Sequence, residues 1–405
     1  MMTTIKIAWR NIWRTPLRSL IVIGSIVLGI WAGIFVIGFC YGLNSQRTMN
    51  RIKSEVSHIQ IHHPEYEKDF DSKFTIEDPI TLEKTFEANP EIKSYALRSL
   101  QMGMISSPIK SNGVQIIGVN KVQEKEVTNL YTNLTDGTYF DTKRKNAILI
   151  GEVLAKKLNV RLRSKVVLTF QDNENNIISG AFRVCGIFKT QFSKYDESHV
   201  FIQNSDLHRL IQSEGYHQAA LLCQSIDQVE SVLSRLNSQL KGVNIKDWEK
   251  IAPELAYADE VMETWLFLIM IIIMLALIFG IINTMLMAVF ERRKELGMLM
   301  AIGMNKSKVF TLILMETFFL SLIGAPTGMI LGALTINLTT ETGIDLSIVG
   351  DGLQSVGLSN IIYPIIETKF YFLTGILVFL FTLIAAIYPS KKALRLKPTE
   401  AIRTI

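Results

Sequence analysis

Four long runs of apolar residues stand out along the chain, and each is long enough to cross a lipid bilayer. They are Leu20–Leu43, Trp265–Phe290, Val309–Leu334 and Phe370–Tyr388. Only the third contains a charged residue, Glu316. At a rise of ~1.5 Å per residue, helices of these lengths match or nearly match an apolar slab ~30 Å thick. The pattern predicts a four-span membrane protein rather than a protein with four buried core helices.

The distribution of positive charge predicts how the spans are oriented. Lys and Arg gather before the first run, between the second and third runs, and after the fourth, whereas Thr335–Thr368 contains none. Because short cytoplasmic loops retain Lys and Arg, we expect both termini in the cytoplasm and the long segment Asn44–Thr264 on the outside. The net charge of +5 lies mainly near the membrane ends, so nucleic acid is not an expected partner.

The long external segment has a mixed α and β pattern. Two predicted strands, Lys165–Phe170 and Ile177–Phe188, flank the polar turn sequence QDNENN, which is typical of a hairpin. We expect two α+β lobes, with a hairpin lobe at about residues 112–203 inserted into the other lobe. Ser45–Glu55 and Pro253–Thr264 have helical composition and are expected to extend the first two spans as stalks.

The predicted fold class is therefore a membrane α-helical protein with four transmembrane helices and a large α+β periplasmic domain between the first and second. In residue numbers, the expected order is an amphipathic interfacial helix at 1–18, the first span at 19–43, the periplasmic domain at 44–264, the second span at 265–290, a cytoplasmic helix at 291–308, the third span at 309–334, a periplasmic loop at 335–369, the fourth span at 370–388 and a cytoplasmic tail at 389–405.

Two features near the predicted inner surface carry charge next to apolar residues. In the first segment, TTIKIAWRNIWRTP, apolar residues share one face and Lys6, Arg10 and Arg14 recur on another, as in a helix that lies flat on the inner leaflet. Such a helix is either a simple anchor or part of a gate. Glu316 is expected to pair with a basic residue or to lie near the inner interface, because an isolated acid within a span is costly.

A short charged segment separates the second and third runs. Glu291–Ile302 contains good helix formers and no proline, and Gly303 is well placed to end the helix. Its apolar residues form a stripe that comprises Leu296, Leu299 and Met300, with Ile302 and Met304 nearby. Two interpretations remain open: a solvated turn helix that joins two spans, or a docking helix whose stripe enters a groove on a cytoplasmic partner.

Motifs for catalysis, metal binding and nucleotide binding are missing from the sequence. No Gly is followed by Lys, which excludes a GxxxxGK[ST] phosphate loop, and HExxH, CxxC and GxSxG do not occur. His62 and His63 are adjacent on a predicted strand and face opposite ways, which does not favour a shared metal. We therefore expect no catalytic residues and no metal site, and treat both histidines as ordinary surface or edge residues. Pairing between Cys185 and Cys223 stays open.

Three stretches together resemble a known family. AWRNIWRTPLRSL, NTMLMAVFERRKELGMLMAIGMNKSKVF and AAIYPSKKALRLKPTEAIR, combined with a large external α+β domain, are similar to the four-span permeases of mechanotransmitting ABC transporters. That group contains the lipoprotein-releasing type (LolC and LolE), the macrolide-exporter type (MacB) and FtsX. The order of DGTYFDTKRKNAILIGEVLAKKLNV, KVVLTF and VNIKDW is most similar to the lipoprotein-releasing branch. One departure is RLRSK at 161–165, where that branch has a Gly–Asp turn.

The resemblance implies a non-catalytic permease subunit of the bacterial inner membrane. It implies an ABC ATPase partner that binds ATP and Mg, with no cofactor in this chain, a second permease copy or paralogue, and contact with membrane lipids. The residues that would couple to the ATPase are Glu291, Arg292, Glu295, Leu296, Gly297, Leu299, Met300, Ala301, Gly303 and Met304.

For the substrate, the resemblance implies extraction of lipoproteins from the outer leaflet of the inner membrane and transfer to a periplasmic carrier. The acyl chains would lie between the first two spans, near Phe35, Phe39, Met262, Trp265, Leu266 and Ile269. The carrier would dock at the hairpin turn, formed by Gln171, Asp172, Asn173, Glu174, Asn175 and Asn176. The alternatives are efflux of peptides or drugs, as in MacB, and regulation of a periplasmic cell-wall hydrolase, as in FtsX.

Overall fold

The chain divides into two compact units. The structure, a computed structural model, describes residues 2–14, 16–140, 145–172, 174, 176–355 and 358–394. Of the segments discussed above, Asn173, Asn175 and the tail from residue 395 onward lie outside the described residues. The first unit comprises Met1–Asn44, Glu260–Asp345 and Ile361–Ile405, and the second comprises Ser45–Asp259 and Leu346–Asn360.

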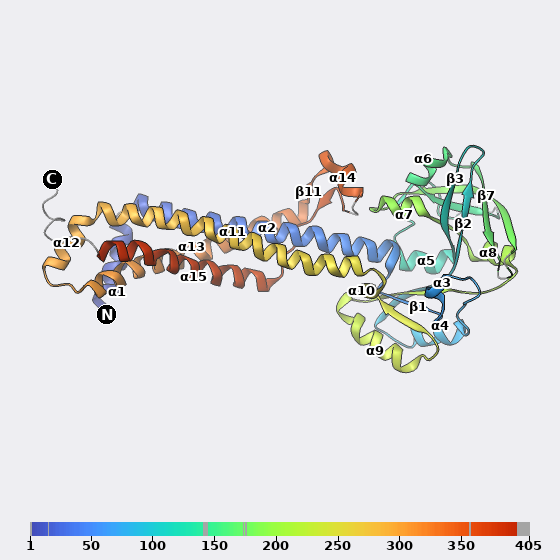
Figure 1. The fold of residues 1–405 in the computed structure, drawn as a ribbon, viewed down its shortest axis with the longest axis horizontal. Coiled ribbons are helices and arrows are strands. Elements are labelled where there is room, and N and C mark those ends of the chain that lie inside the picture. The colour runs from blue at the N-terminus through green and yellow to red at the C-terminus, as the bar shows by residue number, and fades with distance from the viewer. Residues whose placement is uncertain are drawn as a thin grey trace. The chain divides into compact units, whose positions relative to one another are not determined.

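The first unit contains long apolar helices at the four predicted places (Figure 1). They are α2 (Pro16–Arg51), α11 (Pro253–Glu291), α13 (Lys306–Thr342) and α15 (Thr368–Leu394). These four are the helices, within the described part of the chain, that are long and apolar enough to cross a membrane. The prediction of four spans with a large domain between the first and second is confirmed.

Close contact between α2 and α13 depends on glycines. Three glycines on α13, spaced by four residues, face three isoleucines of the same spacing on α2. A Cβ atom built on any of the three glycines would lie only 2.9 Å from the facing isoleucine. The pairs are Gly324 with Ile26, Gly328 with Ile30 and Gly332 with Ile34. Small residues at this spacing let the backbones of membrane helices approach closely, and the three isoleucines are fully buried.

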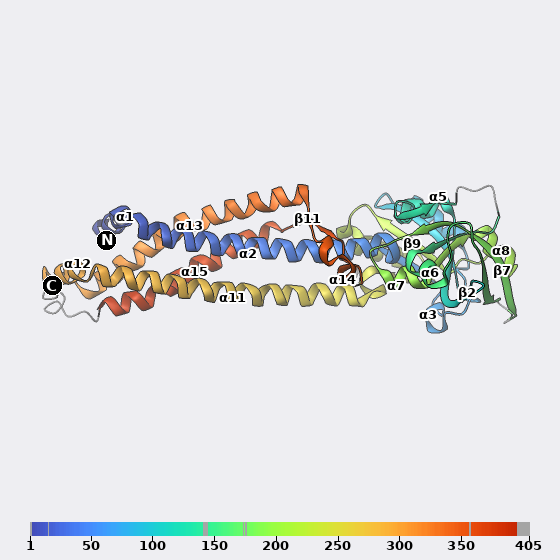
Figure 2. The ribbon, with the colours of Figure 1, turned by 90° about the horizontal axis from the view of Figure 1, so that it is seen from above.

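The amino-terminal helix α1 (Met2–Arg14) packs against α13. Ala8 and Ile12 of α1 are buried, and the Trp9 ring makes an edge contact with Phe319 of α13 at 5.3 Å between centroids. Trp13 is exposed. The helix is amphipathic as predicted, and part of its apolar face is used to pack on protein. Figure 2 gives a second view of α1 and the long helices.

The second unit is built on one ten-stranded mixed sheet. β3 pairs with β8 and β5 with β7 in parallel, and the other pairs are antiparallel. β6 (Lys165–Gln171) pairs with both β2 and β7. The remaining strands run in the order β10 (Asn244–Asp247), β1 (Ile59–His62), β9 (Gln218–Cys223), β2 (Ile92–Ser106), β3 (Ser111–Val119), β8 (His199–Gln203), β5 (Ala147–Gly151), β7 (Ile177–Phe188) and β4 (Leu134–Gly137).

Helices pack on this sheet over three hydrophobic cores. One core joins α4 and α9 to β1 and β9, and the other two lie around β3, β5 and β8. β2 runs through both regions, because β9 pairs with its first half and β6 with its end. The helices of the second unit are α3 (Tyr66–Asp69), α4 (Pro79–Glu87), α5 (Lys121–Val127), α6 (Glu152–Leu158), α7 (Ser193–Ser198), α8 (Asn204–Ile211), α9 (Val229–Gln239), α10 (Trp248–Ile251) and α14 (Gly350–Ser355), of which α14 contacts α7.

The helical extensions of the first two spans are present, with one difference at the end of α2. The α-helix ends at Arg51 and continues as a π-helix, Ile52–Val56, in which the Ser57 N–H donates to the Ile52 carbonyl at 2.8 Å. Ser57 then adopts a φ of +64° and starts the path into β1. The sequence predicted an ordinary helix to Glu55, because single-residue propensities do not distinguish α from π turns.

The segment between α13 and α15 also carries structure that the sequence did not predict. α13 continues to Thr342 and is capped at Gly343, whose φ is +71°. Beyond it, β11 (Ile344–Asp345) pairs with β12 (Ile361–Ile362) in a small antiparallel sheet. The expected loop at 335–369 is therefore partly helix and strand.

Candidate functional site

A buried ion pair joins α13 to the segment between the second and third spans. Glu316 lies in α13 with only 12% of its side chain exposed. Arg292, between α11 and α12 (Arg293–Ala301), donates from Nη1 to both carboxylate oxygens of Glu316, at 2.9 and 3.0 Å. Of the two alternatives predicted for Glu316, pairing with a basic residue is confirmed.

Three further contacts extend this pair to α1 and α12. Asn11 of α1 donates from Nδ2 to Glu316 at 2.7 Å. Arg292 donates from Nε to Glu295 of α12 at 3.1 Å, and Arg14 of α1 approaches the other oxygen of Glu295 at 3.4 Å. We call these five residues the α12 network. Charge-assisted hydrogen bonds, which are stronger than neutral ones, join α1 to α13 through Asn11 and α12 to α13 through Arg292. The Arg14–Glu295 contact adds an exposed ion pair between α1 and α12.

The electrostatics of the α12 network fix its charge state. Burial alone would lower the pKa of Arg292, but the carboxylates of Glu316 and Glu295 outweigh that effect and raise the pKa above its usual value. The guanidinium is therefore a permanent cation beside two acids. Breaking such a pair on one side leaves an uncompensated charge that is costly to keep buried.

The face of α12 available to a partner differs from the predicted stripe. Leu296 is only 2% exposed and packs in the core of the first unit, and Gly297 beside it is also buried. The expectation that Leu296 belongs to a docking stripe is therefore wrong, because a helix attached to two spans turns its most apolar face toward them. Met298 and Ile302, with 57% and 78% exposure, are the large apolar residues on the open side.

The other residues assigned to coupling are distributed between the two sides of α12. Gly303 has a φ of +99° and follows the C-terminus of the helix, as predicted for a helix stop. Of the remainder, Glu291 and Ala301 are exposed, while Leu299, Met300 and Met304 are half-buried. Sequence reasoning did not single out Met298, because it lies outside the stripe that was followed.

The residues assigned to a lipid cavity between the first two spans lie on both sides of the helices. Phe39 stacks on Phe35 at 6.4 Å between centroids, and Phe35 stacks on Trp31 at 6.2 Å. Trp265 is 59% exposed, whereas Leu266 is 4% exposed and belongs to the core of the unit. Leu266 therefore faces the other helices of its own unit and not the open side of the span. Met262 and Ile269 are half-buried.

The hairpin turn is held by one aspartate. Asp172 accepts hydrogen bonds from the backbone N–H groups of Glu174 and Asn176, at 2.9 and 2.8 Å. Its other carboxylate oxygen accepts from the side-chain amide of Asn176 at 3.1 Å. This self-bonded turn is local chemistry typical of Asp and Asn, and it presents its exposed residues at the tip of β6 and β7.

A groove of about 620 Å³ lies beside this hairpin, and sequence reasoning missed it. Met102 and Met104 of β2 line it with 58% and 43% exposure, and Phe70 and Ile177 contribute further exposed apolar surface. Alternating methionines in the stretch QMGMIS were the available signal. Exposed methionine suits adaptable contacts with a partner.

The departure at RLRSK does not prevent the turn before β6. Arg163 occupies the position that needs a left-handed backbone, with a φ of +67°. Its N–H donates to the Val184 carbonyl at 2.9 Å, and the Arg161 N–H donates to Ser164 Oγ at 3.0 Å. The turn therefore forms without the glycine that usually adopts this conformation.

The side chains considered for metal binding and disulfide formation have other roles. Among the described residues, no group of three or more His, Cys, Asp and Glu side chains is arranged to hold a metal. His62 is not a surface residue: it is 5% exposed and its Nδ1 lies 2.9 Å from the His217 carbonyl oxygen. Cys185 and Cys223 are not bonded to each other.

Comparison with known proteins places the chain in a family. The model described as "MacB-like periplasmic core domain" matches residues 19–239, more than half of the chain, and "FtsX-like permease C-terminal" matches residues 267–398. The lipoprotein-releasing system transmembrane protein LolC of Haemophilus influenzae is 24% identical, over 94% of this chain and 91% of that protein. LolE of the same organism is 21% identical, over 99% of each chain.

A solved structure of the periplasmic region of MacB from Actinobacillus actinomycetemcomitans covers 51% of this chain and 96% of that one, with 18% identity and a TM-score of 0.36. The two matching family models follow one another along the chain, and the full-length relatives span nearly all of it. The chain belongs to the family of ABC transporter permeases that combine a MacB-like periplasmic core domain with an FtsX-like permease C-terminal domain, and it is a multi-pass membrane protein.

Proposed function

We propose that this permease converts ATP hydrolysis by a partner ATPase into movement of its large domain, with α12 as the element that the ATPase pushes. The single observation that carries this proposal is the α12 network, in which Arg292 and Glu316 tie α12 to α13 and Glu295 ties it to α1. A short helix held by charged contacts to two others transmits displacement instead of absorbing it. Met298 and Ile302 would provide its contact with the ATPase.

The long helices would carry the displacement across the bilayer. α2 and α11 each run without a break from residues of the first unit into residues of the second. Proline occurs in them only as the first residue, Pro16 in α2 and Pro253 in α11. In this proposal the four helices span a bacterial inner membrane, with both termini and α12 in the cytoplasm and the large domain in the periplasm. The distribution of Lys and Arg favours this orientation. A second permease copy or paralogue would complete a central cavity.

For the substrate, we propose lipoproteins extracted from the outer leaflet. The support is the similarity in sequence to proteins named for lipoprotein release over nearly the whole chain. The acyl chains would contact the exposed side of Trp265 and the stacked rings of Phe35 and Phe39. The alternatives are efflux of a peptide or drug, which the test below distinguishes by what the complex captures, and regulation of a cell-wall hydrolase.

The hairpin turn and the groove beside it would receive a periplasmic carrier. The apolar groove residues Met102, Met104 and Ile177 would cover part of an acyl-binding protein during transfer, and the polar turn at Asp172 would set its register. Apolar surface of this kind marks interaction sites on proteins.

The experiment that tests the proposal is purification of the chain with its ATPase from membranes, followed by mass spectrometry of bound molecules. We expect acylated lipoproteins to co-purify and to be released when ATP is added. With Glu295→Lys, the amount released by ATP should fall at least tenfold. A soluble peptide as the sole captured molecule would remove lipoprotein release. Failure of any ATPase to co-purify would remove the coupling proposal itself.

A further inference from the structure

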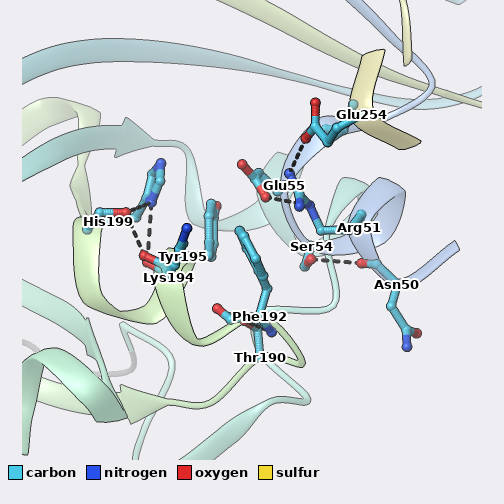
Figure 3. A network of polar contacts seen from close by, with 12 residues as sticks. Asn50, Arg51, Ser54, Glu55, Thr190, Phe192, Lys194, Tyr195, His199 and Glu254 are labelled. Carbon is cyan, nitrogen blue, oxygen red and sulfur yellow. Dashed lines mark hydrogen bonds and ion pairs between the residues drawn. The ribbon is translucent and has the colours of Figure 1, made fainter. Parts of the chain in front are cut away.

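Arg51, the last residue of α2, contacts three other elements of the large domain (Figure 3). Its Nη2 donates to Glu254, in the first turn of α11, at 3.2 Å. Its Nε lies 2.9 Å from Glu55 of the π-helix, an ion pair without the alignment of a hydrogen bond. The guanidinium carbon lies 4.2 Å from the centre of the Phe192 ring. Only 10% of the Arg51 side chain is exposed.

Phe192 belongs to a well-fixed turn of the hairpin lobe, which is the part of the ten-stranded sheet formed by β3 to β8. The Phe192 N–H donates to Thr190 Oγ1 at 3.1 Å, and the Thr190 N–H and hydroxyl donate to the buried carboxylate of Asp196. On the next turn, the Tyr195 ring stacks on His199 of β8 at 4.1 Å between centroids. Phe192 is therefore tied through Thr190 and Asp196 to α7, whose Tyr195 packs on β8.

The backbone directly after Arg51 is poorly suited to transmit movement. It is the π-helix Ile52–Val56 followed by Ser57 at a φ of +64°, so α2 turns into β1 through an irregular joint. π turns are uncommon and concentrate at functional sites. The side chain of Arg51 crosses this joint and reaches the hairpin lobe directly, which provides a second and shorter connection.

The surroundings leave room for the contacts of Arg51 to change. A cavity of about 470 Å³ is lined by Arg51, Glu55, Glu254, Tyr195 and His199 together with residues of β1 and β9. The cavity therefore provides open volume directly beside the ion pair of Arg51 and Glu254. Glu254 is also the most exposed member of the group, at 55%.

We propose that Arg51 is the positioning residue that passes movement of α2 and α11 to the hairpin lobe. The proposal rests on the ATP-driven movement proposed above. With Glu254 engaged, Arg51 holds the ends of both long helices against Phe192, and with Glu254 released, α11 moves independently of that turn. Arginine suits this role because its planar group presents an edge to carboxylates and a face to an aromatic ring at the same time.

The first arm of the test uses the full-length chain in lipid nanodiscs without nucleotide. Cys40, Cys185 and Cys223 are replaced by serine, and spin labels are placed at the exposed positions Lys84 on α4 and Lys156 on α6. We expect Arg51→Gln to broaden the distance distribution between the labels at least twofold.

The matched control for this arm is Arg235→Gln. It removes an arginine ion pair, with Glu91 at 3.3 Å, that lies within one region of the domain and joins no long helix to the hairpin lobe. The distribution should stay as narrow as in the unaltered chain. If Arg51→Gln leaves the distance distribution as narrow as in the unaltered chain, the proposal is overturned, whatever result the second arm with ATP and ADP gives.

The second arm uses the complex with its ATPase and compares ATP with ADP. Arg51→Lys keeps the charge, Phe192→Leu keeps both ion pairs and Glu254→Gln changes an exposed residue, so at least one variant is expected to fold normally. We expect each to reduce the ATP-dependent change in distance at least twofold, while the rate of ATP hydrolysis stays within twofold of the unaltered complex.

The two proposals fail in different ways. If the three variants of the second arm show the same ATP-dependent change in label distance as the unaltered complex, the role of Arg51 is overturned. An unaltered complex that hydrolyses ATP without any change in distance would overturn the transmission step and count against the proposed function, even if Arg51→Gln broadens the distribution in the first arm.

Discussion

At the scale of single residues, the most informative contact is the pair formed by Arg292 and Glu316. We expect Arg292→Gln to destabilise the protein by about 3 kcal/mol, because it leaves the buried Glu316 carboxylate without its cation. The measurement is thermal unfolding in detergent, compared with Lys294→Gln on the exposed side of α12.

The double variant tests whether the pair or the individual side chains matter. Arg292→Gln combined with Glu316→Gln should recover most of the loss, because two neutral amides can hydrogen-bond in place of the ions. A double variant as unstable as the sum of the single variants would show that the two residues act independently.

A second residue-scale prediction concerns pH. Burial raises the pKa of Asp196 to about 7, against the opposing effect of its hydrogen bonds from Thr190. Between about pH 4 and pH 7 the folded protein holds a proton that the unfolded chain has released. The stability of the domain should therefore fall as the pH rises through that window.

Asp196→Asn should remove this dependence and stabilise the protein at pH 8. The pKa difference of roughly three units sets an upper bound of about 4 kcal/mol on the gain. Unfolding of the full-length chain at pH 4 to 8 measures it, and the exposed Asp136→Asn serves as the control. A slope unchanged by Asp196→Asn would assign the pH dependence to other groups.

At the scale of elements, the packing of α13 on α2 gives a direct prediction. Gly328→Val should destabilise the first unit by about 1–3 kcal/mol, because the new side chain overlaps Ile30. Gly280→Val on α11 is a matched control, since a Cβ there meets nothing within 4 Å. Equal melting temperatures for the two variants would contradict the close α2–α13 contact.

Most elements could be predicted from the sequence, and the exceptions have physical reasons. The strand Ile177–Phe188 was predicted with the ends that it has, because alternating residues and the polar turn before it define its bounds. β4, with the sequence LTDG, has no alternation to reveal it. The π-helix after Arg51 depends on tertiary contacts that local propensity does not contain.

The candidate site was predictable only in part. The charged helix between the spans, its stop at Gly303 and an ionic partner for Glu316 followed from residue types and spacing. The burial of Leu296 did not, because a stripe along a helix does not tell which protein surface covers it. The contact of Arg51 with Glu254 joins positions 203 residues apart, and no pattern in a single sequence indicates such a pair.

At the scale of the whole molecule, the central claim is that α12 receives force from an ATPase. The permease family and the four apolar helices are established by the comparisons and the structure, whereas docking at α12 is our proposal. The proposal predicts that the ATPase contacts Met298 and Ile302 on the open face of α12 and does not contact Ile177 beside the hairpin.

The most direct measurement is photo-cross-linking in intact membranes from a reactive amino acid at Met298, Ile302 or Ile177. We predict a cross-link from Met298 and Ile302 to a nucleotide-hydrolysing subunit, with a yield that changes when ATP is added, and none to that subunit from Ile177. A cross-link to the ATPase from Ile177, or cross-links from α12 to periplasmic proteins, would contradict it.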